Sequence, residues 1–164
     1  MQKIASTPLT GGQAHQVPAI LIAGLVAGLL DLLFVSALWW PSGVSPVAIL
    51  QVIASGMIGA KAFDGGLVSA GFGAMLHFIL TVAMAAIYIL CAPNALRRNP
   101  WIGGTIYGAM IWAVMNLVVV PLSAAPVGPP PTLVAIADFV GHLMFVGLPI
   151  AFFARRSDRR NARL

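Results

Sequence analysis

Five strongly polar side chains stand within long apolar stretches of this sequence, and four of them, two aspartates and two histidines, are of the types that carry protons. They are Asp31, His77, Asn116, Asp138 and His142. An apolar surrounding disfavours the charged form of a carboxyl group, and a nearby histidine can take its proton or share it in a hydrogen bond. Such Asp/His pairs inside membranes form proton relays and ion paths. The same residues can instead form a hydrogen-bonded network that only fixes how the helices pack.

Two further chemistries would use the same residues. His77 and His142 could ligate one haem axially, and together with Asp31 they could bind a divalent metal. Each arrangement needs the side chains to converge on one point, and the sequence offers no second histidine pair and no Cys/His zinc spacing. We therefore expect no cofactor. The sequence also has no Ser-His-Asp order and no phosphate-binding loop, which favours a protein that is not an enzyme.

The elements that must position these side chains are transmembrane helices. The chain has 164 residues, of which 60% are hydrophobic and 8% are charged, whereas a soluble domain carries about 25% charged residues. This composition excludes a soluble globular domain and a disordered chain. Four apolar stretches are long enough to cross a bilayer, at about 18–40, 67–91, 101–122 and 133–154. Because backbone polar groups in lipid need internal partners, each is predicted to be a helix.

A fifth apolar stretch lies between the first two spans. It runs from Val47 to Ala60, follows the helix-starting pair Ser45-Pro46, and is too short to cross the membrane. It predicts a short interfacial or re-entrant helix over about 46–60. The expected fold class is all-α: an integral membrane four-helix bundle with this extra helix, in one transmembrane domain over 1–164.

The basic residues predict the orientation of the chain in the membrane. With four spans, eight of the nine Lys and Arg residues fall on one side, in the N-terminal segment, the 92–100 loop and the tail 155–164, and only Lys61 falls on the other. This bias places both termini in the cytoplasm. The basic tail is too small for the phosphate-binding face of a nucleic-acid-binding protein, so no nucleic-acid partner is expected. The bilayer is the expected partner, and the tail can contact its anionic headgroups.

Small residues recur at helical spacing in every predicted span, and they permit close approach of helix backbones. They are Gly24 and Gly28 in the first span, Ala70, Gly73 and Ala74 in the second, Gly104 and Gly108 in the third, and Ala137 and Gly141 in the fourth. Each of the five polar side chains lies on the small-residue face of its helix. We therefore predict that the polar side chains face the interior of the bundle, where they are shielded from lipid.

The positions of the polar residues along the spans predict two polar layers. At about 1.5 Å per residue, Asp31, His77 and His142 lie roughly 13–16 Å from the outer ends of their helices. By the same count, Asn116 and Asp138 lie about 8 Å deep. The sequence thus predicts a middle layer of one acid and two histidines, with a second layer nearer the outer surface.

Four stretches of the sequence carry a family resemblance. They are Ser55 to Phe78, Asn99 to Gly108, Met115 to Ser123 and His142 to Arg156. Together they resemble a family of small bacterial inner-membrane proteins with four spans and no assigned activity. The resemblance implies a bacterial origin and a location in the inner (plasma) membrane, and it supplies no functional residue.

Two functions remain open from the sequence. As a transport-like protein, alone or as a homo-oligomer, the chain would use the polar cluster to move protons or to bind a small polar ligand. As an accessory subunit of a larger membrane complex, it would dock on its partner through its small-residue faces and outer loops. In that second case the polar cluster would only hold the helices together.

Overall fold

The computed structural model describes residues 11–162, and over this range the chain is helical with no β-strand. The α-helices are α1 (Gly11–Trp39), α2 (Pro46–Ile58), α3 (Gly66–Cys91), α4 (Asn94–Arg98), α5 (Pro100–Val114), α6 (Val120–Leu122), α7 (Thr132–Gly141) and α8 (Leu148–Asn161). The 3-10 turns η1 (Trp40–Ser42) and η2 (Gly59–Phe63) extend α1 and α2. The π-helical turns η3 (Met115–Val119) and η4 (His142–Gly147) join α5 to α6 and α7 to α8. The all-α prediction is confirmed.

Five helical stretches are long and apolar enough to cross a membrane, as expected of a multi-pass membrane protein. They are Gln16–Ser42, Pro46–Phe63, Gly66–Cys91, Pro100–Leu122 and Thr132–Arg160. Four of them coincide with the predicted spans. The stretch Pro46–Phe63 is the segment for which the sequence predicts a shorter helix over about 46–60, and η2 lengthens it. Length and composition alone therefore give five candidate spans where the sequence predicts four.

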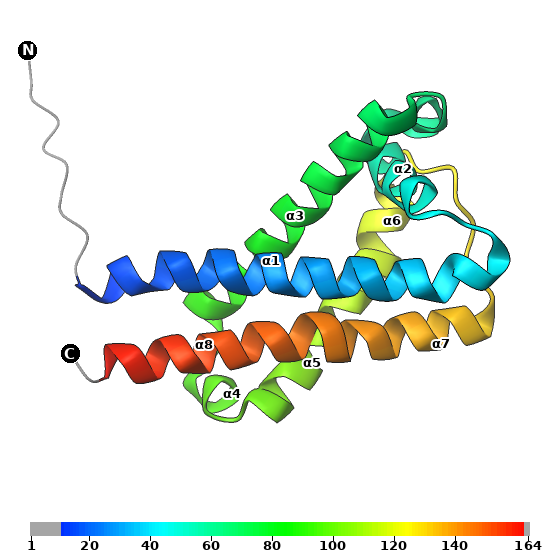
Figure 1. Cartoon of the computed structure of the whole chain (residues 1–164). Helices are drawn as coiled ribbons and strands as arrows, with labels where there is room; N and C mark the ends of the chain where they lie inside the picture. The colour runs from blue at the N-terminus through cyan, green and yellow to red at the C-terminus, as the bar shows by residue number, and fades with distance from the viewer. Residues whose placement is uncertain (1–10, 163–164) are drawn as a thin grey trace, which may run out of the picture.

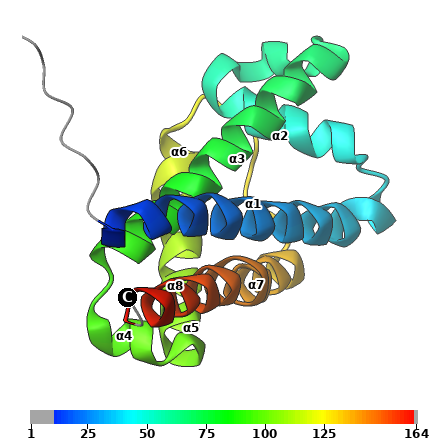
Figure 2. The same ribbon diagram turned by 60° about the vertical axis from the view of Figure 1, so that its left-hand side comes forward.

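The long helices run between two ends of the molecule (Figure 1). Helix α1 and the continuous α7–η4–α8 helix lie side by side and run in opposite directions, while α3 and α5–η3–α6 cross them obliquely (Figures 1 and 2). The first turn of α1, the last turn of α8 and α4 lie together at one end, and η1 lies at the other. Helix α1 packs on α3 and α8, α5 packs on η4 and α8, and α2 packs on α3.

Local sequence explains where the helices begin. The Ser45 side chain caps α2 by accepting a hydrogen bond from the Ala48 N–H at 3.2 Å. Asn99 caps α5 by accepting one from the Ile102 N–H at 3.3 Å, and a proline follows each cap at the first helical position. Helix α1, in contrast, begins at Gly11 and contains Pro18, where the sequence predicts the start. An interior proline removes its own N–H from the backbone ladder and its ring crowds the carbonyl four residues earlier, but helices of membrane proteins tolerate such a residue.

Glycines of α1 and α3 lie where neighbouring helices come closest. A Cβ atom on Gly24 would meet the backbone of Val82 in α3, and one on Gly73 would meet the backbone of Leu50 in α2. Gly28 faces two side chains of α3 in the same way. These glycines therefore set the distance at which α1 and α2 pack against α3.

Glycines also allow close packing of α5 on the π-helical turn η4. Gly104 faces the backbone of Leu148 and Gly147, and Gly108 faces the backbone of His142. Gly147 in turn lies against the backbone of Gly104 and Gly108. Because both surfaces consist of backbone atoms, neither can yield to an added side chain.

An apolar core fills the bundle toward the end that carries α4. It draws buried residues from α1, α3, α5, η4 and α8: Ala23, Ala27, Ala85, Tyr88, Ile89, Tyr107, Ile111, Val146, Ile150, Ala151 and Ala154. Farther along α1, Gly141 lies against the ring of Phe34, which stacks on Phe145 with ring centroids 5.0 Å apart. The level between this core and the far end is where the polar residues lie.

We expect Gly108→Ala to lower the free energy of unfolding by about 1–3 kcal/mol, the usual effect of overpacking. The added Cβ would lie 2.6 Å from the carbonyl oxygen of His142, which belongs to rigid helix backbone. Unfolding of the purified protein in detergent measures the change. Gly71→Ala is the matched control, because Gly71 is exposed on α3 with open space around it, and it should leave stability unchanged or slightly higher. Equal stability of the two variants would contradict the close packing of α5 on η4.

Candidate functional site

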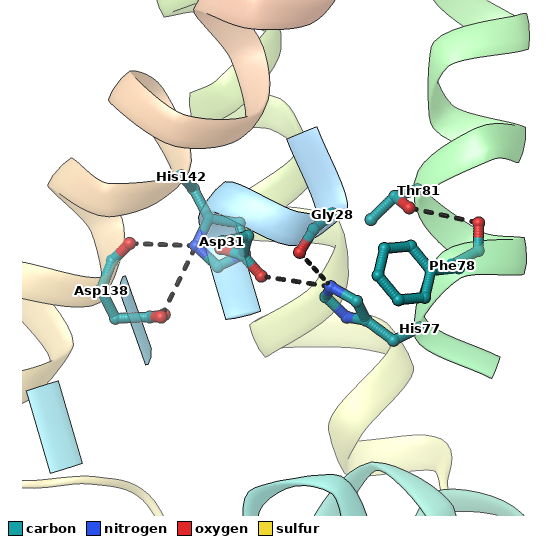
Figure 3. A network of polar contacts seen from close by, with 7 residues as sticks. All are labelled: Gly28, Asp31, His77, Phe78, Thr81, Asp138 and His142. Atoms are coloured by element: carbon teal, nitrogen blue, oxygen red, sulfur yellow. Dashed lines mark hydrogen bonds and ion pairs between the residues drawn. The ribbon is translucent and has the colours of Figure 1, made fainter. Parts of the chain in front are cut away.

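Four of the five predicted polar residues come together where α1, α3 and the α7–η4 junction meet (Figure 3). Asp31 comes from α1, His77 from α3 and Asp138 from α7, and His142 is the first residue of η4. Their side chains are 14%, 12%, 22% and 14% exposed, respectively. We refer to these four residues as the Asp/His cluster. The cluster is thus assembled from three separate long helices and largely shielded by them.

His77 is positioned by the backbone of α1. Its Nε2 atom lies 2.9 Å from the carbonyl oxygen of Gly28 and 3.9 Å from Oδ2 of Asp31. A carbonyl oxygen can only accept, so Nε2 carries the hydrogen and a neutral ring has its lone pair on Nδ1. The 3.9 Å separation is too long for a hydrogen bond but within ion-pair distance. Asp31 therefore attracts His77 most strongly when the imidazole is protonated.

His142 adopts the opposite arrangement within its own helix. Its Nδ1 atom lies 2.9 Å from the backbone carbonyl oxygen of Asp138 and 3.5 Å from the Oδ1 atom of the same residue. By the same reasoning, Nδ1 carries the hydrogen and the lone pair of the neutral ring is on Nε2. Asp138 is fixed in turn by α5, because the indole Nε1–H of Trp112 donates to its Oδ2 at 2.8 Å.

Asp31 lies beside His77 and close enough to His142 for an electrostatic interaction. Its carboxyl group interacts electrostatically with His142 and His77, and also with Asp138. Figure 3 draws Asp31 at the level of His142, with His77 on the side toward α3. The cluster thus contains two acids and two imidazoles, and each neutral imidazole has one lone pair that can take a proton. Its residues have the types and the proximity that proton transfer between neighbouring groups requires.

The sequence does not reveal Trp112 as a member of this network. The sequence does contain a signal for it, because a tryptophan inside an apolar span needs a hydrogen-bond partner for its indole N–H. Asn116, which the sequence predicts to be part of the cluster, instead donates from Nδ2 to the carbonyl oxygen of Trp112 at 3.1 Å, within its own helix. Asn116 therefore reaches the cluster only through the backbone of Trp112.

The predicted outer and middle polar layers are in contact through one pair of residues. Asp138, predicted for the outer layer, and His142, predicted for the middle layer, are four residues apart on one helix, and their side chains lie 3.5 Å apart. The π-helical turns are also absent from the sequence prediction. One begins at His142 and the other at Met115, directly before Asn116. Such turns interrupt α-helices frequently at functional sites.

The cluster is closed on the side toward α4. Thr81, one turn beyond His77, is 4% exposed, and its hydroxyl donates to the carbonyl oxygen of Phe78 at 3.2 Å. Beyond it lies the apolar core, where the Tyr107 hydroxyl donates to the carbonyl oxygen of Met84 at 2.7 Å. The polar groups near this side therefore bond to backbone and do not extend the network toward α4.

The arrangement is not that of a metal centre. Among the residues that the structure describes, no three His, Cys, Asp or Glu side chains are grouped so that they could hold a metal ion. The Nε2 atom of His77 is also turned onto a backbone carbonyl, as described above, and its hydrogen prevents it from ligating. The divalent-metal alternative for Asp31, His77 and His142 therefore gains no support from their geometry.

Comparison of the chain with protein-family models, with curated proteins and with solved structures gives no match. The site combines four titratable groups from three helices, and its two histidines carry their hydrogens on different ring nitrogens, Nε2 in His77 and Nδ1 in His142.

We expect the two histidines to occupy different neutral tautomers. In 15N-histidine-labelled protein at alkaline pH, His77 should give the Nε2–H form and His142 the Nδ1–H form, because each N–H is fixed by a carbonyl acceptor. Solid-state NMR distinguishes the forms by nitrogen chemical shift, and the variants His77→Gln and His142→Gln assign the signals. Observation of the same tautomer at both positions would contradict the geometry.

Proposed function

We propose that the protein handles protons within the membrane through the Asp/His cluster. The observation that carries this proposal is the pairing of acids with histidines inside the bundle: Asp31 on α1 lies 3.9 Å from His77 on α3, and Asp138 lies 3.5 Å from His142 on η4. A proton can pass between such groups without a free charge entering the lipid. Two acids and two imidazoles also allow the cluster to gain or lose a proton while its net charge stays small.

The topology that fits this proposal has four membrane spans. The first turn of α1 and the last turn of α8 lie at the same end of the molecule, which supports an even number of crossings (Figures 1 and 2). The regular part of α2 has 13 residues and is therefore about 20 Å long, shorter than the hydrocarbon core. Gly59, with φ of 64°, ends it and η2 turns the chain into α3. We therefore place α2–η2 as a re-entrant segment rather than as a fifth span.

Hydrogen bonds tie this re-entrant segment to α3. The Gln51 side-chain amide donates to the carbonyl oxygen of Gly66 at 3.1 Å, and the Ser69 hydroxyl donates to that of Ala62 at 2.5 Å. Buried polar groups with internal partners of this kind are what a segment within the membrane requires. With four spans, the arginines of α4 and α8 share one side, and the bias of basic residues supports a cytoplasmic location for it in a bacterial inner membrane.

The direction of access follows from what surrounds the cluster. The apolar core separates the cluster from the α4 end, whereas Asp138 lies on the part of the helix nearer the opposite end and is the most exposed member. We infer that protons enter at Asp138 and reach Asp31 and His77 through His142. For this step His142 must first adopt its other tautomer, because Nδ1 already carries a hydrogen toward Asp138 and cannot accept a second one. Release on the α4 side requires a rearrangement, and we assign it to η4, the π-helical turn that carries His142.

The alternative function, an accessory subunit, would use the small-residue faces to dock on a larger complex. Those faces pack inside this chain: Gly24 against α3, Gly73 against α2, and Gly104 and Gly108 against η4 and α8. They are therefore not free for a partner. No specific contact in the described part of the chain favours this role over proton handling.

We expect Asp31→Asn to reduce proton flux in liposomes to the level of empty vesicles. The amide cannot exchange a proton with either histidine, while its size and shape are nearly unchanged. A pH-sensitive dye inside the vesicles measures the flux after a potential is imposed. The matched control is Asp64→Asn, which removes the same charge from an exposed turn outside the cluster and should keep wild-type flux.

His142→Gln provides a second variant in case Asp31→Asn folds poorly, and circular dichroism of each sample reports its helix content. Flux through the wild-type protein no greater than in empty vesicles would contradict the proposal. Unchanged flux in a folded Asp31→Asn protein would also contradict it, because it would show that the cluster serves only to hold the helices together.

A further inference from the structure

A second polar site lies at the end of the molecule that carries α4. It is a pocket of about 550 Å³ between α4 and the last turns of α8. Its lining residues are Asn94, Arg97, Arg98, Arg155, Asp158, Arg159 and Ala162. Two segments that are far apart in the sequence thus contribute arginines to one concave surface, which we call the arginine pocket.

Arg97 builds one wall of the arginine pocket. Its guanidinium donates from Nε to Oδ2 of Asp158 at 3.0 Å and from Nη2 to Oδ1 of the same carboxylate. Its Nη1 donates to the carbonyl oxygen of Ile89, near the end of α3, at 2.6 Å. This bidentate ion pair fixes α8 against the α3–α4 turn and neutralises the one acid in the lining. The role of Arg97 is therefore to position the pocket.

The other arginines leave a surplus of positive charge. Four arginines and one aspartate line the pocket, so the formal charge is 4 − 1 = +3. The ion pairs within the described part of the chain involve Arg97, His77 and His142 as the cations, and none includes Arg98, Arg155 or Arg159. A planar guanidinium matches the oxygen atoms of a phosphate group, and three of them around one pocket favour such a group strongly.

The residues beside the arginine pocket indicate its level relative to the membrane surface. Trp101, at the start of α5, is 63% exposed and packs edge-on against Phe152 of α8, with ring centroids 5.0 Å apart. Tryptophan is enriched where the hydrocarbon ends and the headgroups begin. On α8, the buried residue Ala154 directly precedes Arg155, and the buried residue Ile150 lies one turn before Ala154. The pocket therefore lies at the level where lipid phosphates would be found.

We propose that the arginine pocket is a specific binding site for a phosphate group, held by Arg98, Arg155 and Arg159. The depth of the pocket favours the phosphate of an anionic phospholipid headgroup as the source, and a soluble phosphate is the other. The tail arginines alone are too few for such a site, and the fold completes it by adding α4. This proposal is independent of proton handling by the Asp/His cluster.

The test uses the full-length protein purified in neutral detergent. Native mass spectrometry measures retention of added phosphatidylglycerol against phosphatidylcholine, and thermal unfolding measures stabilisation by inorganic phosphate. The wild type should retain phosphatidylglycerol preferentially. The double variant Arg155→Gln/Arg159→Gln should bind it about 30-fold more weakly, the loss expected from removing two arginines near a headgroup.

The matched control is Arg156→Gln/Arg160→Gln, which removes the same charge from exposed positions of the same helix outside the pocket lining. It should bind nearly as well as the wild type. Arg98→Gln, on the exposed surface of α4, provides a third variant if the α8 double variant loses helix content. It should weaken binding about fivefold.

The two measurements distinguish a lipid headgroup from a soluble phosphate as the source of the bound phosphate group. Retention of phosphatidylglycerol without stabilisation by inorganic phosphate identifies a lipid site, and stabilisation by inorganic phosphate alone identifies a site for a soluble ligand. An equal loss of binding in the control and pocket variants would overturn the proposal, because it would show attraction to surface charge in general. Binding of neither probe by the wild-type protein would overturn it as well.

Discussion

A carboxyl group halfway along an apolar helix has to be turned away from the acyl chains, and this constraint governs the arrangement of the helices. An aspartate at the centre of a span costs about 2.5–3.5 kcal/mol to insert, which the apolar residues of α1 offset. Asp31 avoids lipid by lying inside the bundle, where its carboxylate is 3.9 Å from His77. Three helices must then approach closely at this level, and small residues such as Gly28 and Gly141 allow them to do so.

The same close packing connects the cluster to the rest of the bundle. Gly108 on α5 touches the backbone of His142, so the position of the imidazole depends on how α5 and η4 interlock. Trp112, one turn farther along α5, holds Asp138 by a hydrogen bond. At the α4 end, the ion pair between Arg97 and Asp158 fixes α8, which continues directly from η4. The close packing of α5, the Asp/His cluster and the basic end of the molecule are therefore joined through one continuous helix.

The sequence predicts the helical class and the location of the long apolar helices, because hydrophobicity and length alone decide which segments suit lipid. It does not predict features that depend on the neighbouring helices. The spacing of polar and small residues is interpreted with the period of a regular α-helix, so it does not predict the π-helical turns at Met115 and His142. Asn116 has a carbonyl of its own helix within reach and bonds to it, while Trp112 finds Asp138 on another helix. Likewise, only the folded chain brings Arg98 beside Arg155.

The most direct test of the central claim, that Asp31 and His77 act as a pair, is a double-mutant cycle on unfolding in detergent. Asp31→Asn and His77→Gln are measured singly and together, with Asp31→Asn and the distant, exposed Asp64→Asn as the reference pair. Contact between the two side chains predicts a coupling free energy of about 0.5–1.5 kcal/mol for the first pair and a value within about 0.3 kcal/mol of zero for the reference. Effects of Asp31→Asn and His77→Gln that simply add, with no more coupling than in the reference pair, would contradict it.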